Sequence, residues 1–181
     1  MAACRLHTEA MGNRLTVLAT IGYEGADQAD FIASLHAAAI TRLIDVRELP
    51  ISRRRGFGKS ALSTALDEAR IEYIHLRGLG DPKIGREAAR SGDFVRFKKI
   101  FAAHMQSATA RTDLAIASLL VSEGGACLMC YERDHSACHR TIVANAISDT
   151  LPLTIRHIGV RAGLAARNIA TPTWEFTGQR P

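Results

Sequence analysis

Short apolar runs alternate along the chain with longer stretches in which apolar residues recur every three or four positions. The short runs are continuous and rich in β-branched or bulky residues, which predicts strands buried on both faces. They cover residues 15–21, 42–46, 71–76, 126–131 and 153–158. Helical spacing predicts helices over 26–40, around 62–69, over 94–105, over 114–120 and over 138–147.

Repeated strand–helix–strand order with continuous apolar strands predicts an α/β fold. We expect a single-domain open parallel sheet with helices on both faces, a Rossmann-like, doubly wound arrangement, over residues 15–160. Residues 1–14 are polar and patternless, and we expect a loosely packed or disordered leader there. Residues 161–181 are predicted to form an irregular C-terminal tail.

Composition narrows the class of protein. The chain has 181 residues, of which 47% are hydrophobic and 23% charged, so it can fill a core and is neither disordered nor a coiled coil. No apolar run approaches the roughly 18 residues of a membrane span, and the first residues lack the apolar centre of a secretion signal, so we expect a cytoplasmic protein. The net charge of +5 favours an anionic partner such as nucleic acid.

Ligands of open α/β sheets bind beyond the carboxyl ends of the strands. Tyr23 and Glu24 follow the first predicted strand, Asp45 ends the second, and Tyr131 and Glu132 end or follow the fourth. A carboxylate such as Asp45 in this place can orient water or stabilise developing positive charge. The alternative is a structural Asp45 that fixes the following loop through its backbone amides.

The loop after Asp45 is strongly basic, with Arg47, Arg53, Arg54 and Arg55 close to a strand end. Arginine suits bidentate contact with phosphate, and several such contacts give salt-dependent affinity for nucleic acid. The alternative is a solvated loop in which Arg47 pairs with Asp45 or Glu48. Position favours a binding role for Arg47 and Arg53.

Three of the four cysteines cluster with a histidine: Cys127, Cys130, Cys138 and His139 could supply four zinc ligands. A strand would send Cys127 and Cys130 to opposite faces, so we expect reduced cysteines, no metal and no cofactor. The helix predicted to begin near Cys138 instead offers free amides to an anion. His139 and Arg140 would contact a phosphate there, unless Arg140 is an internal brace to Glu132.

Four motifs together resemble one known family. They are Ile21-Gly-Tyr-Glu-Gly25, Asp45-Val-Arg47 with Ser52-Arg53, Tyr73-Ile-His-Leu76 with Leu79-Gly80, and Cys130-Tyr-Glu132 with Cys138-His-Arg140. Over residues 15–150 the chain resembles the domain-of-unknown-function family 488. The resemblance implies the α/β fold and a shared site formed by the motif residues, to which Cys127 does not belong.

Basic charge, strand-end carboxylates and neighbouring tyrosines predict a hydrolase acting on duplex DNA, most concretely a repair glycosylase that excises an alkylated base. Asp45, Glu132 and Glu24 are the candidate catalytic residues. The candidate substrate-binding residues are Tyr23, Arg47, Ser52, Arg53, Tyr131, His139 and Arg140.

Two other interpretations stay open. One is an enzyme acting on a nucleotide or other anionic small molecule in the same crevice. The other is a non-catalytic nucleic-acid-binding module in which Cys130 and Cys138 sense a metal or an oxidant.

Overall fold

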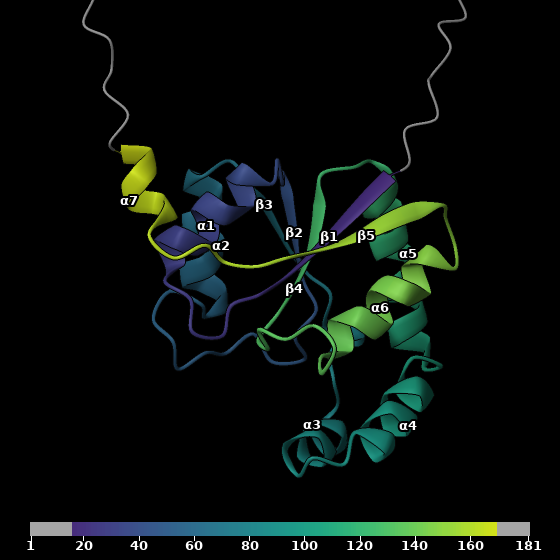
Figure 1. Ribbon diagram of the computed structural model, residues 1–181. Coiled ribbons are helices and arrows are strands. Elements are labelled where there is room, and N and C mark those ends of the chain that lie inside the picture. Colours follow the sequence, from purple (N-terminus) through teal and green to yellow (C-terminus); the bar gives the residue numbers. More distant parts are fainter. Residues whose placement is uncertain (1–15, 170–181) are drawn as a thin grey trace, which may run out of the picture.

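The structure is a computed structural model that describes residues 16–169, and it is built on a five-stranded parallel sheet (Figure 1). The strands are β1 (Thr16–Gly22), β2 (Arg42–Asp45), β3 (Glu72–His75), β4 (Ala126–Cys130) and β5 (Leu153–Ile158). Their order across the sheet is β3-β2-β4-β1-β5. The open parallel sheet predicted from the sequence is confirmed.

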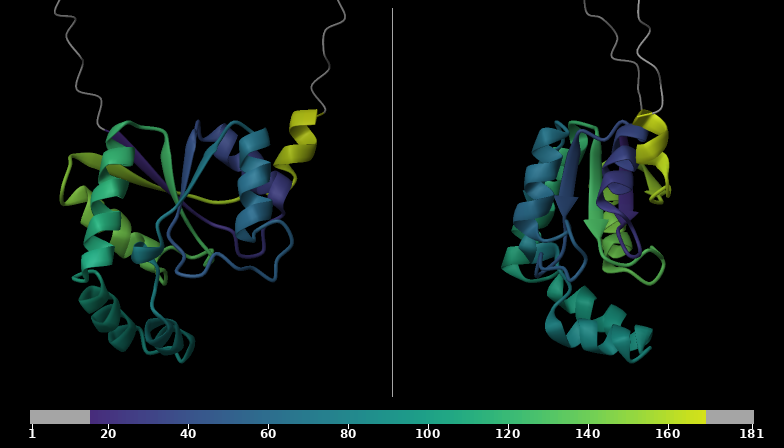
Figure 2. Two further views of the ribbon diagram at one scale, coloured as in Figure 1. Left: turned by 180° about the vertical axis from the view of Figure 1, so that it is seen from behind. Right: turned by 90° about the vertical axis from the view of Figure 1, so that its left-hand side faces the viewer.

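Helices cover both faces of the sheet (Figures 1 and 2). Helices α1 (Gln28–Ala37) and α2 (Lys59–Glu68) lie on one face, and α5 (Ala108–Ser122) and α6 (His139–Ser148) lie on the other. Each layer has its own apolar core, because successive side chains of a strand point to opposite faces. In β4, Cys127 packs into the core beneath α1 and α2, whereas Cys130 packs into the core beneath α5 and α6. The predicted separation of these two cysteines is therefore confirmed.

Two further helices, α3 (Lys83–Arg90) and α4 (Phe94–His104), project beyond the carboxyl edge of the sheet (Figures 1 and 2). The connection to them passes through a short 3-10 turn, η1 (Arg77–Leu79). The hydrophobic pattern missed α3 because this helix has few apolar residues and a glycine in its middle. A Cβ at Gly85 would lie 2.0 Å from a carboxylate oxygen of Asp81, so the helix needs a glycine there to let Asp81 approach.

The prediction of an irregular segment over 161–181 is wrong for its first part, where α7 (Leu164–Ile169) forms. Asp30 in α1 accepts hydrogen bonds from the backbone N–H groups of Gly163 (2.7 Å) and Ala165 (2.9 Å), which fixes the start of this helix. The predicted leader 1–14, Cys4 and the rest of the tail lie outside the described residues. Among the helices of residues 16–169, none has the length and apolarity needed to cross a membrane.

Candidate active site

A large cavity of about 990 Å³ opens at the carboxyl edge of the sheet, between the loops after β1, β2 and β4 and helix α3. Basic residues outnumber acidic ones in its lining, which makes it suitable for an anionic ligand. The lysine and arginine residues are Arg47, Arg53, Arg54, Lys83, Arg86 and Arg90. The carboxylates are Glu48, Asp81, Glu87 and Glu132, and the remaining residues are Tyr23, Leu49, Ile51, Ser52, Cys130, Tyr131 and His139.

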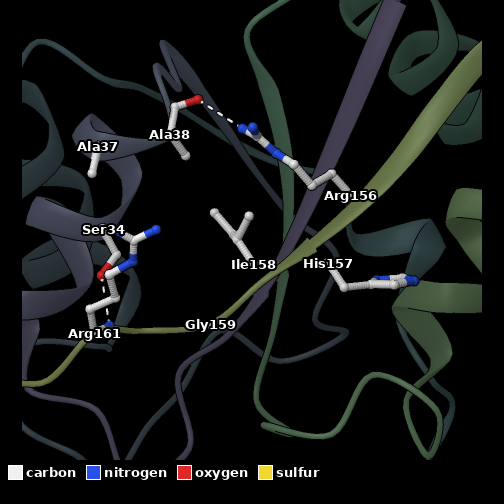
Figure 3. Close-up of a pocket in the computed structure, with 8 residues that line it drawn as sticks. All are labelled: Ser34, Ala37, Ala38, Arg156, His157, Ile158, Gly159 and Arg161. Carbon is white, nitrogen blue, oxygen red and sulfur yellow. Dashed lines mark hydrogen bonds between the residues drawn. The ribbon is translucent and has the colours of Figure 1, made fainter.

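A second, smaller cavity of about 280 Å³ lies between α1 and β5 (Figure 3). The eight residues that line it include neither a carboxylate nor a thiol. Its polar groups hold the scaffold together: the Arg156 guanidinium donates to the carbonyl of Ala38 (3.0 Å), and the Arg161 N–H donates to Ser34 Oγ (3.0 Å). We therefore take the larger cavity as the candidate active site.

Asp45 and Arg47 form a buried ion pair beneath this cavity. Arg47 Nη2 lies 2.6 Å from Asp45 Oδ2, and its Nε lies 2.9 Å from Oδ1. The Tyr73 hydroxyl donates to Oδ2 (2.6 Å), and the Arg47 backbone N–H donates to Oδ1 (3.0 Å). Asp45 has no exposed surface and does not line the cavity. The structure thus departs from the expectation of a substrate-facing Asp45 and agrees with the structural alternative.

Arg47 is also held from its other side, by the Tyr23 hydroxyl (2.8 Å) and the carbonyl of Phe57 (3.0 Å). Burial disfavours its charge, but hydrogen bonds to Asp45 and the attraction of that carboxylate outweigh burial and raise the pKa of Arg47. Burial and the charge of Asp45 likewise raise the pKa of Tyr73. Arg47 contributes to the cavity wall, yet only 6% of it is exposed, so it reaches a ligand at one edge of its guanidinium at most.

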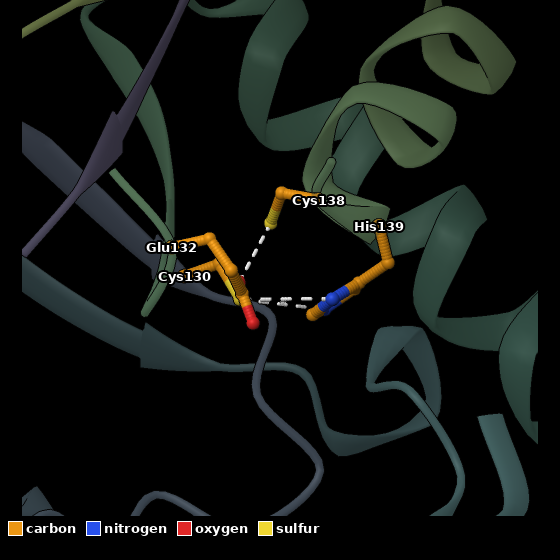
Figure 4. A group of neighbouring side chains, drawn as sticks. All are labelled: Cys130, Glu132, Cys138 and His139. Atoms are coloured by element: carbon orange, nitrogen blue, oxygen red, sulfur yellow. Dashed lines mark hydrogen bonds between the residues drawn. The ribbon is translucent and has the colours of Figure 1, made fainter. Parts of the chain in front are cut away.

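Glu132 lines the cavity. It lies beside Cys130, Cys138 and His139 (Figure 4). One carboxylate oxygen accepts hydrogen bonds from both thiols, at 3.0 Å each. Cys130 Sγ lies 3.6 Å from His139 Nδ1, and His139 Nε2 lies 2.8 Å from the carbonyl of Val46. The structure therefore brings two candidate site residues, Glu132 and His139, together with the thiols of Cys130 and Cys138.

Opposing influences set the charges in this cluster. Burial would raise the pKa of Glu132, but hydrogen bonds from the thiols of Cys138 and Cys130 lower it. Burial would lower the pKa of His139, but its contacts with Cys138 outweigh burial and raise this pKa to about 9. Burial raises the pKa of both Cys130 and Cys138. These shifts favour an ionised Glu132 beside a protonated His139 and the protonated thiols of Cys130 and Cys138.

Backbone packing holds Glu132 in place from the far side. A Cβ at Gly22, where β1 ends, would lie 1.8 Å from the carbonyl oxygen of Glu132, so only glycine allows the loop after β4 to approach. Arg140 donates to the same carbonyl and to that of Arg133 (3.2 Å). Arg140 is only 1% exposed and does not line the cavity. Its predicted phosphate contact is therefore wrong, and it is an internal brace to the backbone of Glu132.

Glu24, the third candidate carboxylate, does not join the site. It is exposed, it is not part of the cavity lining, and its Oε2 accepts a hydrogen bond from the backbone N–H of Arg133 (3.1 Å). Its place after β1 is as expected, but its carboxylate supports the loop after β4 instead of facing the cavity.

Aromatic rings form one wall of the cavity. Tyr23 is 2% exposed and stacks on Phe57, with ring centroids 4.4 Å apart. Tyr131 meets Tyr23 edge to face at 5.4 Å and is itself 45% exposed. Tyr131 can therefore contact a substrate, whereas Tyr23 mainly fixes Tyr131 and Arg47.

The arginines of the basic loop after β2 differ in their contacts. Arg54 donates to the backbone carbonyls of Ala26 and Gly25, so it ties the loop to the turn after β1. Ser52 Oγ accepts the backbone N–H of Arg54 (3.1 Å) while lining the cavity. Arg53 is exposed, lines the cavity, and has no hydrogen bond or ion pair with any residue of the described chain. Arg53 is thus the loop arginine best placed to meet a ligand.

Asp81 is a site residue that the sequence analysis missed. It lines the cavity, is only 6% exposed, and its Oδ1 finds no hydrogen-bond partner within the described residues. Burial raises the pKa of this carboxyl group to about 6. The sequence did hold one signal for Asp81, which directly follows the Leu79-Gly80 motif. Gly80 packs closely against Glu48, another residue of the cavity lining, because a Cβ at Gly80 would lie 2.1 Å from the Glu48 nitrogen.

A family model described as Domain of unknown function DUF488 matches residues 27–147, which is two thirds of the chain, and the protein belongs to this family. The match includes Asp45, Arg47, Asp81, Glu132 and the Cys138-His139-Arg140 motif. No curated protein and no solved structure matches the chain significantly.

Proposed function

We propose that the protein is a hydrolase acting on DNA, and that it cleaves the N-glycosidic bond of an alkylated base. The observation that carries the proposal is the cavity in which basic residues outnumber acidic ones, with the buried Asp81 and the half-buried Glu132 in its lining. Basic residues suit the phosphates of a nucleic acid, and carboxylates suit the positive charge that develops on the sugar during cleavage.

The rim of the cavity supports DNA as the substrate. Leu49 and Ile51 lie in its lining and are 49% and 78% exposed, next to Arg53. Exposed apolar side chains beside phosphate-binding arginines are suited to entering a base stack, since proteins that extrude a base fill or wedge the gap. Tyr131 also lines the cavity, and its exposed ring is available for stacking on the extruded base.

The chemistry assigns different roles to the two carboxylates. In N-glycosidic hydrolysis the base leaves with the bonding electron pair, and water adds to the sugar carbon and loses a proton. We assign to Glu132 the stabilisation of the sugar cation and the orientation of that water. Burial raises the pKa of Asp81 to about 6, and we assign to Asp81 the acceptance of the proton that the water loses.

Arg47, Asp45 and Tyr73 act through other groups in this proposal. Their buried network holds the floor from which the basic loop departs, and they are positioning residues. His139 and Ser52 lie in the lining and are available to contact the substrate.

The test is incubation of the full-length protein with duplexes that each contain one alkylated, deaminated or oxidised base, beside undamaged duplex and free nucleotides. We expect strand breakage after alkali only in alkylated duplexes, with the free base detected by mass spectrometry. Absence of abasic sites in every duplex would overturn the proposal. Turnover of free nucleotides alone would replace it with the small-molecule interpretation.

A further inference from the structure

We propose that Cys130, Glu132, Cys138 and His139 bind one divalent transition-metal ion, with Zn²⁺ as the preferred ion. One ligand atom from each of the four lies within 4.8 Å of the others (Figure 4). Cys130, Glu132 and His139 also line the cavity. This inference goes beyond the proposed function and does not depend on it, because metal binding is measured without any substrate.

The distances that join Glu132 to both thiols, and Cys130 to His139, are close to those of a tetrahedral site. Zinc bonds of about 2.3 Å to sulfur and about 2.0–2.2 Å to nitrogen or oxygen place neighbouring ligand atoms about 3.3–3.8 Å apart. Cys130 Sγ and His139 Nδ1 are 3.6 Å apart, and each thiol sulfur is 3.0 Å from the same Glu132 oxygen. The carboxylate oxygen would move outward by about half an ångström to admit the ion.

His139 has the orientation of a metal ligand. Its Nε2 donates to the carbonyl of Val46 at 2.8 Å, since a carbonyl can only accept. This bond leaves Nδ1 facing Cys130 Sγ. Histidines that bind metals characteristically donate their other ring nitrogen to a carbonyl or carboxylate, which fixes the ring and its ligating atom.

The local sequence explains why these four residues converge. Cys130 ends β4, and Glu132 follows two positions later, after a bend at Tyr131. The ligand atoms of both residues lie in the cluster. Cys138 is the N-cap of α6, and His139 is its first residue. The partial positive charge at the start of a helix favours anionic ligands such as thiolates.

The donor types narrow the choice of ion. Two thiolates, one imidazole and one carboxylate form a set typical of Zn²⁺ and poorly suited to Mg²⁺ or Ca²⁺, which prefer oxygen. The alternative set, with Cys127 as the fourth ligand, does not form because Cys127 packs into the core on the other face of the sheet. The sequence analysis predicted no metal because Cys127 would point away from the other three possible ligands. In the structure Glu132 provides the fourth ligand in place of Cys127.

Glu132 also connects this ion to the cavity. It is half-buried, whereas the two cysteines and the histidine are buried, so it is the ligand most open to solvent. A substrate or a water molecule can replace it on the ion and leave its carboxylate next to the reacting group. A bound Zn²⁺ would then supply Lewis-acid activation of that water.

The experiment measures metal in untagged, full-length protein purified under reducing conditions. We expect about one zinc per chain by elemental analysis, and a metal-depleted sample that takes up one equivalent of Zn²⁺ in calorimetric titration. One equivalent of Co²⁺ should give thiolate-to-cobalt charge-transfer absorption and the visible bands of a tetrahedral site.

Substitutions of single residues test which side chains bind the ion. Cys130→Ser and Cys138→Ser should each weaken Zn²⁺ binding at least about 100-fold, and Glu132→Gln about 10-fold or more. Cys127→Ala and Cys4→Ala should leave stoichiometry and affinity unchanged. Circular dichroism checks that each variant is folded.

Three results would overturn the inference: no stoichiometric Zn²⁺ or Co²⁺ uptake by the folded protein, cobalt absorption without thiolate character, or equal loss of binding in Cys127→Ala. Metal binding without any cleavage of DNA would leave this inference standing and remove the proposed function. Cleavage of DNA without metal binding would leave the proposed function standing and overturn this inference.

Discussion

Arg47 Nη2 lies 2.6 Å from Asp45 Oδ2 in a pair that is almost wholly removed from solvent, with 0% of Asp45 and 6% of Arg47 exposed. Removing one partner of such a pair leaves an uncompensated buried charge, which costs about 3–5 kcal/mol. We therefore expect Asp45→Asn to lower the free energy of unfolding by about that amount in urea denaturation. Asp67→Asn, an exposed carboxylate in α2, should change it by less than about 0.5 kcal/mol.

A stable Asp45→Asn protein that has lost only its cleavage activity would contradict this interpretation. It would return Asp45 to the chemistry, as the sequence alone suggested. Folding and cleavage therefore need to be measured on the same preparation.

We expect substitution of Asp81 to raise the stability of the protein and to lower its activity. Folding raises the pKa of its carboxyl group from 3.8 to about 6 because of burial. Ionised Asp81 therefore destabilises the folded state above about pH 6, and this cost disappears as the pH falls toward the unfolded value. In metal-depleted protein, Asp81→Asn should be more stable than the natural chain at neutral pH by up to about 3 kcal/mol, with no gain near pH 4.

The same Asp81→Asn substitution should lower cleavage about 100-fold or more if Asp81 transfers a proton. Glu87→Gln is the matched control, because Glu87 lines the same cavity but is exposed. A stability difference that does not vary with pH would show that Asp81 titrates normally.

Arg53 should contribute to DNA affinity through charge. Loss of one phosphate contact reduces the slope of log affinity against log salt by about one. We expect Arg53→Gln to weaken binding at low salt and to reduce this slope, measured by fluorescence anisotropy on a labelled duplex. Arg55→Gln, in the same loop but outside the cavity lining, should have a smaller effect. Equal effects of the two variants would mean that only the overall charge of the loop matters.

Gly22 should be essential for placing Glu132. Alanine there would bring its Cβ to 1.8 Å from the Glu132 carbonyl oxygen, so the loop after β4 has to move. We expect Gly22→Ala to lower the free energy of unfolding by at least about 2 kcal/mol and to weaken zinc binding. Gly159→Ala adds a Cβ that meets no atom within 4 Å, and it should stay within about 1 kcal/mol of the natural chain. Unchanged zinc affinity in Gly22→Ala would show that the loop position does not determine the site.

The sheet was predictable because each strand is a continuous apolar run, and buried parallel strands require this pattern. Helix α3 was not, since it packs few apolar side chains and tolerates Gly85 to admit Asp81. The strand-end rule placed Tyr131 and Glu132 at the cavity correctly, and the predicted helix start did the same for His139. It could not separate residues that line the cavity from those beneath them. Asp45 ends a strand and Arg140 lies at the start of a helix, but hydrogen bonds with Tyr73 and Thr20, which are distant in sequence, hold them away from the cavity.

The cysteine cluster shows a related limit. Strand alternation correctly removed Cys127 from the site, but it gave no information about the loop that folds Glu132 back between Cys130 and Cys138. That loop depends on contacts across the sheet, such as Gly22 against the Glu132 backbone. Residues far apart in sequence therefore determine the ligand set.

The catalytic role of Glu132 is tested by comparing cleavage by Glu132→Gln and Glu24→Gln, on an alkylated duplex with and without added Zn²⁺. Both glutamates follow neighbouring parallel strands, but Glu132 lines the cavity and Glu24 does not. We expect the natural chain to release the alkylated base, Glu132→Gln to be slower by about 100-fold or more, and Glu24→Gln to be nearly unaffected. Equal activity of the two variants would contradict the catalytic role of Glu132. No base release by the natural chain would contradict the proposed cleavage reaction itself.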